Sequence, residues 1–326
     1  MTDIITFLNT VYFDQEVWIW GLFLTFIAGL LYFDLGYLHR KSSKMTFGQS
    51  AGLTVFYISI AFLFGLWIAY EYGSQRAMTF YTAYLVEESL SLDNIFVMSV
   101  ILAFYKIPLQ YQHRVLFWGI IGVIALRGIV IVLGTALVAK FSWVLLLFGA
   151  LLVFTGLKIM FSKHEDDGPD LEHSRIRQFM LKHFRVTNEL HGDHFIVKKP
   201  DDNGVVRTWI TPLFMALITI EFADLVFAMD SIPAVLAITD DTFIVFTSNI
   251  FAIMGLRAMY FLLAVLLDRF AYLRYALSLV LIMIGGKVFY THFAGEHVDE
   301  WISLSLTVGI LGLGMIVSLF KTRKSR

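Results

Sequence analysis

Long apolar stretches alternate with short polar segments along this chain, and each stretch is close to the length of a bilayer-spanning helix. About 20 mostly apolar residues cross the hydrocarbon layer of a membrane as a helix. The glycine and aromatic content of the stretches favours helices over barrel strands, whose polarity alternates over about ten residues. The pattern predicts nine spans, at 17–38, 50–70, 78–104, 115–139, 141–161, 210–238, 243–267, 273–290 and 301–320.

The composition agrees with a membrane-embedded chain. Hydrophobic residues make up 58% of the sequence and charged residues 16%, with a mean hydropathy of +0.73, whereas soluble domains are about 25% charged. We therefore expect an all-α polytopic membrane protein. The first apolar stretch has no basic segment before it and no small-residue cleavage pattern after it. It is predicted to be a retained span rather than a cleaved signal.

Lysine and arginine are distributed unequally between the two sides of the predicted topology. The side reached after the first span holds nearly all of the loop bases, and only Arg76 and Lys140 lie in loops of the opposite side. Because Lys and Arg concentrate in cytoplasmic loops, the N-terminus is predicted to lie outside and the C-terminus in the cytoplasm.

The loop at 162–209 is the one long polar segment of the sequence. "PDLEHSRIRQFMLKHF" has a helical rhythm, and two β-rich runs flank a "PDDNG" turn, which predicts a hairpin. His191 and His194 in "HGDH" could belong to a regulatory metal site, but such a site needs more ligands at fixed spacing. We expect the two histidines to be solvated and the loop to be regulatory or structural rather than part of a transport path.

Two units of three spans repeat the same polar residues in the same order. "VEESLSLDNIFV" in the third span matches "ADLVFAMDSIPAV" in the sixth; the next span of each unit holds a leucine–arginine pair, and the one after holds a glycine two residues before a lysine. The matched pairs are Glu87 with Asp224, Asp93 with Asp230, Asn94 with Ser231, Arg127 with Arg257, and Lys158 with Lys287.

The odd number of spans in each unit has a geometric consequence. The second unit must enter the membrane from the opposite face, so two inverted three-helix repeats are predicted, as in many transporters whose substrate site lies near the midplane. Parallel repeats and duplicated packing helices without a site stay open. The predicted units are 1–77 with two N-terminal spans, 78–161 with the first repeat, 162–209 with the loop, 210–292 with the second repeat, and 293–326 with the last span and a basic tail.

Ionisable residues inside the predicted spans call for an explanation, since each would cost about 2.5–3.5 kcal/mol at the centre of a lone helix. Structural ion pairs would account for the four bases and four of the acids. The two remaining acids could be neutralised by a divalent cation or by protonation. The acids are Glu87, Glu88, Asp93, Glu221, Asp224 and Asp230, and the bases are Arg127, Arg257, Lys158 and Lys287.

Helical spacing limits which of these groups can meet. At 100° per residue Glu87 and Asn94 share a face, whereas Asp93 points 120° away from Glu87. Two crossing helices or a broken helix could still bring the acids together. Pro233 has no N–H for the carbonyl of Met229, which predicts either a helix break that frees an oxygen ligand or an ordinary kink.

The predicted ligands are all oxygen atoms. Because the chain has no cysteine, disulfides, thiolate ligands and thiol chemistry are excluded. Oxygen ligands select hard cations such as Mg²⁺, Ca²⁺ or Mn²⁺. Nearby methionines could soften the site, although most membrane methionines only pack; they are Met98, Met229 and Met254.

The stretches "VEESLSLDNIFV" and "EFADLVFAMDSIPAV…TSNIFAIMGLRAMYFLLA" resemble the signatures of the TerC membrane-protein family, in its alkaline-inducible Alx-type branch. The resemblance covers nearly the whole chain. It implies a bacterial inner-membrane protein of nine spans, related to LysE-like exporters and associated with manganese efflux, tellurium resistance and a membrane-bound redox role. The family's intramembrane acids fall on Glu87, Asp93, Asp224 and Asp230, while Glu88 stands where the branch often has lysine.

These features, together with the resemblance, predict an exporter of a divalent cation, Mn²⁺ in the first place, with proton coupling as an open alternative. Asp93 and Asp230 are expected to share the cation, with Glu87 and Asp224 as alternate ligands. Glu221, Asn94 and Ser231 are further oxygen donors, and the arginine and lysine pairs serve the acids. No resident cofactor is expected. Lipid and a divalent metal ion are the expected partners, nucleic acid is not, and protein partners stay open. A redox modulator and a membrane partner that delivers metal to exported proteins stay open, whereas no motif of an enzyme is present.

Overall fold

The computed structural model describes residues 9–12, 15–33, 47–141, 143–161, 174–200, 205–263, 273–295 and 298–324. Within these ranges the protein is an all-α polytopic membrane protein with nine long helices, one short helix and two small hairpins. The long helices are α2 (Val17–Phe33), α3 (Phe47–Tyr72), α4 (Ser74–Phe104), α5 (Leu109–Lys140), α6 (Val144–Phe161), α8 (Pro212–Leu236), α9 (Thr242–Leu263), α10 (Leu273–Ala294) and α11 (Glu300–Lys324).

Seven of the long helices are long and apolar enough to cross a membrane, and α2 is a shorter apolar helix. The helix α4 falls outside this set because its ionisable residues are too dense. Every stretch of 18 residues in α4 contains both Glu87 and Glu88 and, in addition, Arg76, Asp93 or both. Each stretch therefore holds more than the two charged residues allowed for a candidate span. The most polar helix in the bundle is therefore the one that carries the first set of predicted site residues.

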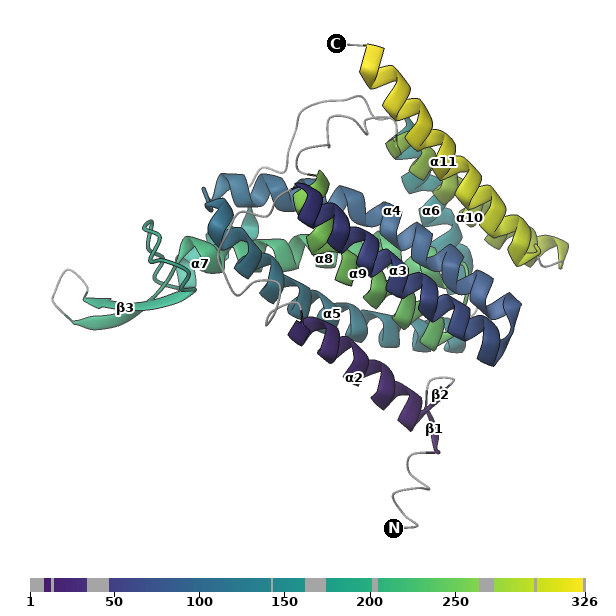
Figure 1. The fold of residues 1–326 in the computed structure, drawn as a ribbon, viewed down its shortest axis with the longest axis horizontal. Coiled ribbons are helices and arrows are strands. Elements are labelled where there is room, and N and C mark those ends of the chain that lie inside the picture. Colours follow the sequence, from purple (N-terminus) through teal and green to yellow (C-terminus); the bar gives the residue numbers. More distant parts are fainter. Residues whose placement is uncertain are drawn as a thin grey trace.

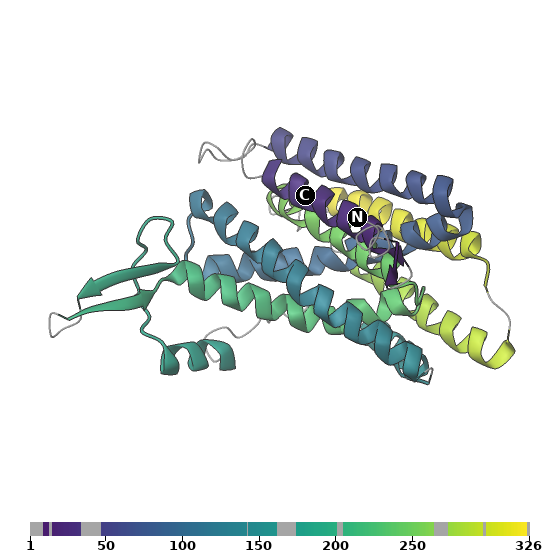
Figure 2. The same cartoon turned by 90° about the horizontal axis from the view of Figure 1, so that it is seen from below.

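Successive helices run back and forth through the bundle, and α6, α10 and α11 are inclined to the others, as Figures 1 and 2 show. At the hairpin end, β3 (Ile196–Pro200) and β4 (Val206–Ile210) pair antiparallel and project from the bundle. The short α7 (Arg175–His183) lies at the same end, where Met180 packs with Met215 of α8.

The opposite end of the bundle, called here the N-terminal end, holds the first short hairpin, β1 (Val11–Tyr12) with β2 (Gln15–Glu16). The Tyr72 hydroxyl at the end of α3 donates to Gln15 Oε1 at 2.9 Å. Gly73 has φ 91°, in the region that favours glycine, and turns the chain directly from α3 into α4. Both hairpins thus mark opposite ends of the same bundle.

Proline sets the start of two helices and does not break a third. Pro108 caps α5, so this helix begins earlier than the predicted span, and Pro212 starts α8 at its first turn, immediately after β4 ends. The break predicted at Pro233 is not found there, because α8 continues through Pro233 to Leu236. The proline stands only three residues before the helix ends, where few backbone bonds remain to be lost.

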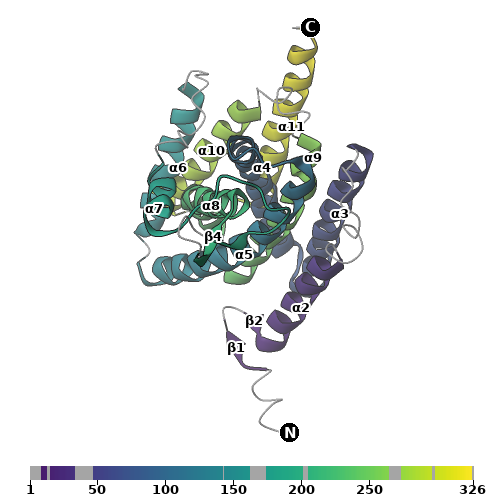
Figure 3. The same ribbon diagram turned by 90° about the vertical axis from the view of Figure 1, so that its left-hand side faces the viewer.

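Aromatic side chains attach the first two helices to the rest of the bundle. Phe23 of α2 and Phe64 of α3 lie against Phe251 of α9, with the Phe64 and Phe251 ring centroids 4.8 Å apart. Trp20 of α2 meets Phe243 edge-on, with the centroids at 5.3 Å. Seen from the hairpin end, α2 and α3 therefore lie along one side of the bundle (Figure 3).

The other helices pack in pairs that join the two predicted units, α4 with α9, α5 with α8, and α6 with α10. The α6–α10 contact is very close and is built on Gly149, Gly156 and Gly285, which we call the glycine seam. A Cβ added at Gly285 would lie 2.6 Å from the Gly149 carbonyl oxygen. A Cβ added at Gly156 would lie 2.7 Å from the backbone carbonyl oxygen of Ser278. Small residues let membrane helices approach this closely.

Candidate functional site

The guanidinium of Arg127 lies at the centre of a buried polar group that we call the arginine cluster. Its Nε and Nη2 donate to the two carboxylate oxygens of Asp224 at 3.0 and 2.9 Å. Its Nη1 donates to Glu87 Oε1 and, at 2.8 Å, to Asn249 Oδ1. The cluster consists of Arg127, Glu87, Asp224, Asn94 and Asn249.

Four helices supply the arginine cluster. Asn94, on the same face of α4 as Glu87, donates to Asp224 Oδ1 at 3.2 Å, as the helical spacing predicts. Arg127 comes from α5, Asp224 from α8 and Asn249 from α9. The planar fork of an arginine suits two-point contact with a carboxylate. One side chain thereby holds together helices from both predicted units.

Burial makes this cluster electrostatically expensive. The exposed fractions of the side chains are 1% for Arg127, 0% for Glu87 and 2% for Asp224. Two carboxylates facing one guanidinium leave a formal charge of −1 on these three groups. Ions removed from water are tolerated only with good geometry and hydrogen bonds to their remaining atoms. That condition is met at Asp224 and only in part at Glu87.

Several polar atoms around the cluster are buried with no hydrogen-bond partner in the described part of the chain. Within the cluster these atoms are Glu87 Oε2 and Asn249 Nδ2. Buried polar groups in native proteins nearly always have partners, so such atoms call for a ligand, an ion or a proton.

Two further intramembrane acids each lie against a glycine of a neighbouring helix. Both carboxylate oxygens of Glu88 are buried without a partner among the described residues, and a Cβ added at Gly255 would lie 3.4 Å from one of them. A Cβ at Gly122 would overlap the carboxylate of Glu221, whose Oε2 is likewise without a described partner. The missing glycine side chains provide the space that these carboxylates occupy.

The remaining predicted site residues divide into two groups. The side chains of Asp93, Asp230 and Arg257 lie outside the described part of the structure, although their backbones belong to α4, α8 and α9. The cation shared by Asp93 and Asp230 therefore stays a prediction.

Three predicted residues lie at or beyond the edge of the cluster. The Ser231 hydroxyl lies 3.5 Å from Arg127 Nη1. Lys158 is exposed in the last turn of α6, and Lys287 of α10 is partly exposed. The ion pairs described for Glu87 and Asp224 are thus made by Arg127.

The described residues contain no group of three or more histidine, cysteine, aspartate or glutamate side chains arranged to hold a metal ion. In the loop, His194 Nδ1 lies 3.5 Å from Asp193 Oδ1, and His191 Nε2 lies 4.0 Å from Glu189 Oε2. Asp193 is also paired with Arg114 of α5, which ties the loop to the bundle.

Asn249 is the member of the cluster that the sequence interpretation missed. It stands in "TSNIFAIMG" on α9, a helix otherwise almost wholly apolar. An amide in such a helix is a usable signal, since polar side chains at this depth are rare and seek partners. A search of the spans for ionisable residues alone does not find Asn249, because an amide carries no charge.

Comparison with known proteins gives a consistent result. A family model described as "Integral membrane protein TerC family" matches residues 72–326. A membrane protein of Rickettsia felis is 46% identical over 302 residues, covering 93% of this chain and 97% of the relative. A relative from Photorhabdus laumondii, 40% identical over 311 residues with 93% and 94% covered, has a name that proposes it as the membrane-bound redox modulator Alx. No solved structure matches the chain significantly.

Proposed function

The chain belongs to the TerC family of integral membrane proteins, and we propose that it exports a hard divalent cation, Mn²⁺ in the first place, across a bacterial inner membrane. The observation that carries the proposal is the arginine cluster. It is a buried group of carboxylates and amides that joins both predicted units and includes one acceptor oxygen, Glu87 Oε2, with no described partner. Intramembrane ionisable residues of this kind mark ion pathways in transport proteins.

The packing of the helices supports an inverted repeat around this cluster. The helix α4 enters at the N-terminal end and α8 at the hairpin end, so the two units run in opposite directions. A twofold axis between the units would exchange α4 with α8 and α5 with α9. It would therefore turn the α4–α9 contact into the α8–α5 contact, and both contacts are present. Alternating access by rocking of one repeat against the other fits this arrangement.

In the proposed cycle Arg127 stands in for the cation when the site is empty. Its guanidinium neutralises part of the charge of Glu87 and Asp224, as a metal ion would. Asp93 and Asp230 supply the main ligands for Mn²⁺, and Ser231, Asn94 and Glu221 supply further oxygen atoms. The all-oxygen set matches hard cations. We propose that protons move in the opposite direction and that the C-terminus faces the cytoplasm.

Flux of Mn²⁺ through the purified protein in liposomes tests the proposal. We expect transport by the wild type, none by Asp93→Asn or Asp230→Asn, and weaker transport by Glu87→Gln. The exposed Glu189→Gln in the loop is the matched control, since its side chain is 78% exposed.

Several results would overturn the proposal. A wild-type protein that is folded and moves no divalent cation would do so, and so would wild-type flux in either aspartate variant. A flavin or haem spectrum in the purified protein would instead favour the redox role named for the relatives.

A further inference from the structure

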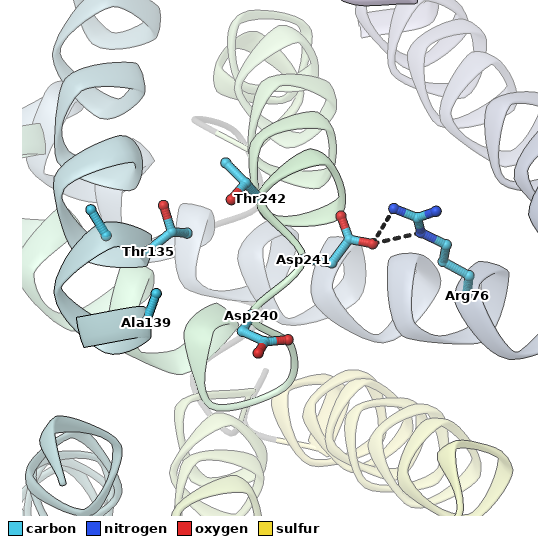
Figure 4. A pocket seen from close by; sticks show the side chains of 7 residues that line it. Arg76, Thr135, Ala139, Asp240, Asp241 and Thr242 are labelled. Carbon is cyan, nitrogen blue, oxygen red and sulfur yellow. Dashed lines mark hydrogen bonds and ion pairs between the residues drawn. The ribbon is translucent and has the colours of Figure 1, made fainter. Parts of the chain in front are cut away.

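A cavity of about 640 Å³ opens at the N-terminal end of the bundle, apart from the arginine cluster. It lies between the start of α4, the end of α5 and the turn from α8 to α9 (Figure 4). Its walls include Arg76, Thr135, Ala139, Asp240, Asp241 and Thr242.

The cavity and the arginine cluster are built on the same helices. Thr135 follows Arg127 by two turns of α5, about 12 Å along the helix axis. Between the two levels lie Ile131 of α5 and, on α8, Ile232 and Leu236, which are all at most 2% exposed. Leu236 and Ile232 fill the space beside Gly134 of α5. An apolar layer thus separates the cavity from the buried carboxylates.

We propose that this cavity is the outer vestibule through which the exported cation leaves, and that the Arg76–Asp241 ion pair is the latch that keeps it closed toward the cluster. This inference rests on the proposed function. It adds an exit route, and it assigns residues that lie outside the arginine cluster.

The latch is suited to repeated opening. Arg76 Nε donates to Asp241 Oδ2 at 2.5 Å, which joins the first turn of α4 to the α8–α9 turn. Figure 4 shows the Asp241 carboxylate directed toward Arg76, while Thr135 and Ala139 lie on the other side of that turn. The two side chains are 26% and 19% exposed. Partly exposed ion pairs are much weaker than buried ones, so this contact can break and re-form.

Asp241 has a second role that any test must preserve. Its Oδ1 accepts the backbone N–H groups of Phe243 and Ile244 at 3.0 and 3.2 Å, and so caps α9. Asparagine is as good a cap as aspartate. Asp241→Asn therefore keeps the cap and removes the charge that pairs with Arg76.

The charge of the vestibule favours cations. Two aspartates and one arginine line it, which gives a formal charge of −1, and Asp240 is exposed on its wall. Lys140 follows Ala139 but does not line the cavity, and its ammonium lies 5.6 Å from the centroid of the Phe141 ring. A concave surface of one sign raises the local concentration of the opposite ion.

The absence of cysteine allows the vestibule to be probed with single-cysteine variants of the full-length protein. In right-side-out vesicles, cationic and anionic membrane-impermeant thiol reagents are applied to Ala139→Cys on the wall and to the exposed Ser74→Cys as control. We expect the cationic-to-anionic rate ratio at position 139 to exceed that at position 74 by about tenfold. Adding Asp240→Asn should lower the ratio at position 139 alone.

The latch is tested at Ile131→Cys, in the apolar layer between the vestibule and the arginine cluster, where the native side chain is 0% exposed. Asp241→Asn and Arg76→Gln should each raise the rate of labelling of this cysteine from outside by about fivefold. This is the change in the open-to-closed ratio that the loss of one partly exposed ion pair would cause. Labelling at Ile68→Cys, buried in α3 away from the cavity, should not change if the fold is intact.

Labelling of Ala139→Cys only from the inner side would overturn the vestibule. Equal labelling of Ile131→Cys with and without the ion pair would overturn the latch and leave Arg76–Asp241 as a static contact. The labelling rates do not depend on transport. A wild-type protein without Mn²⁺ flux would refute the proposed function, and the labelling rates would still test the vestibule and the latch separately.

Discussion

The arginine cluster and the glycine seam both join the α4–α6 unit to the α8–α10 unit, and they do so by opposite means. The cluster brings five polar side chains into the bundle and satisfies most of them with one guanidinium. The seam removes side chains altogether, so that the backbones of α6 and α10 touch at Gly149 and Gly285.

The contrast shows why only one of these contacts is a candidate site. A seam of glycines is stabilised by van der Waals packing alone and offers no ligand atoms. The cluster holds charge that lipid cannot solvate, and its worth depends on every partner being present. Because the stability of the cluster depends on all of its ion pairs and hydrogen bonds, a cation that competes with Arg127 for the carboxylates would change the arrangement of the cluster.

The largest effect is expected from Arg127→Met, which leaves Glu87 and Asp224 buried without their shared cation. Removing one partner of a buried ion pair costs about 3–5 kcal/mol. We expect a large fall in the thermal unfolding temperature of the detergent-purified protein.

The matched control for this variant also changes Glu87→Gln and Asp224→Asn, so that no charge is left uncompensated. It should recover most of the lost stability. If Arg127→Met alone were as stable as the wild type, the cluster would contribute nothing to stability, and the comparison with the seam would fail.

A smaller loss is expected from Gly285→Ala, which would place a Cβ 2.6 Å from the Gly149 carbonyl oxygen. Overpacking of this kind costs about 1–3 kcal/mol. The neighbouring Gly286→Ala is the matched control, because a Cβ there has nothing within 4 Å and alanine favours the helix. Thermal unfolding of both variants checks the seam, and equal stability of the two would show that the helices can move apart at no cost.

Apolar length was enough to predict the architecture from the sequence. All nine predicted spans correspond to helices, and even the weakly marked boundary between the fourth and fifth spans is found, with α5 ending at Lys140 and α6 beginning at Val144. Helix starts were less accurate because local chemistry decides them. Ile210, for example, is apolar enough to read as membrane-embedded, but it pairs with Ile196 in the hairpin.

The candidate site was predictable in its residue types and less so in its pairing. The intramembrane acids and Arg127 stand out in an apolar chain, but nothing in the one-dimensional pattern says that Arg127 reaches both Glu87 and Asp224. That contact depends on how α4, α5 and α8 cross. For Pro233 the sequence left a helix break and an ordinary kink open, and only the break is excluded, because α8 continues through this proline.

The smallest effect is expected in the loop, which belongs to neither contact between the units. His191 and His194 make hydrogen bonds only to loop carbonyls among the contacts described for their rings, at 3.0 and 3.2 Å. The double variant His191→Ala with His194→Ala should change stability by less than about 0.5 kcal/mol and leave Mn²⁺ flux unchanged. Loss of flux in a folded double variant would move the loop into the transport path.

The single guanidinium shared by two carboxylates also has an electrical consequence. Without it, Glu87 and Asp224 would carry −2 through the membrane field; with it, the three groups carry a formal charge of −1. An elementary charge crossing a potential of 100 mV involves about 2.3 kcal/mol of work. The membrane voltage would then do half as much work on these three groups, wherever they move through the field, as on a bare pair of carboxylates.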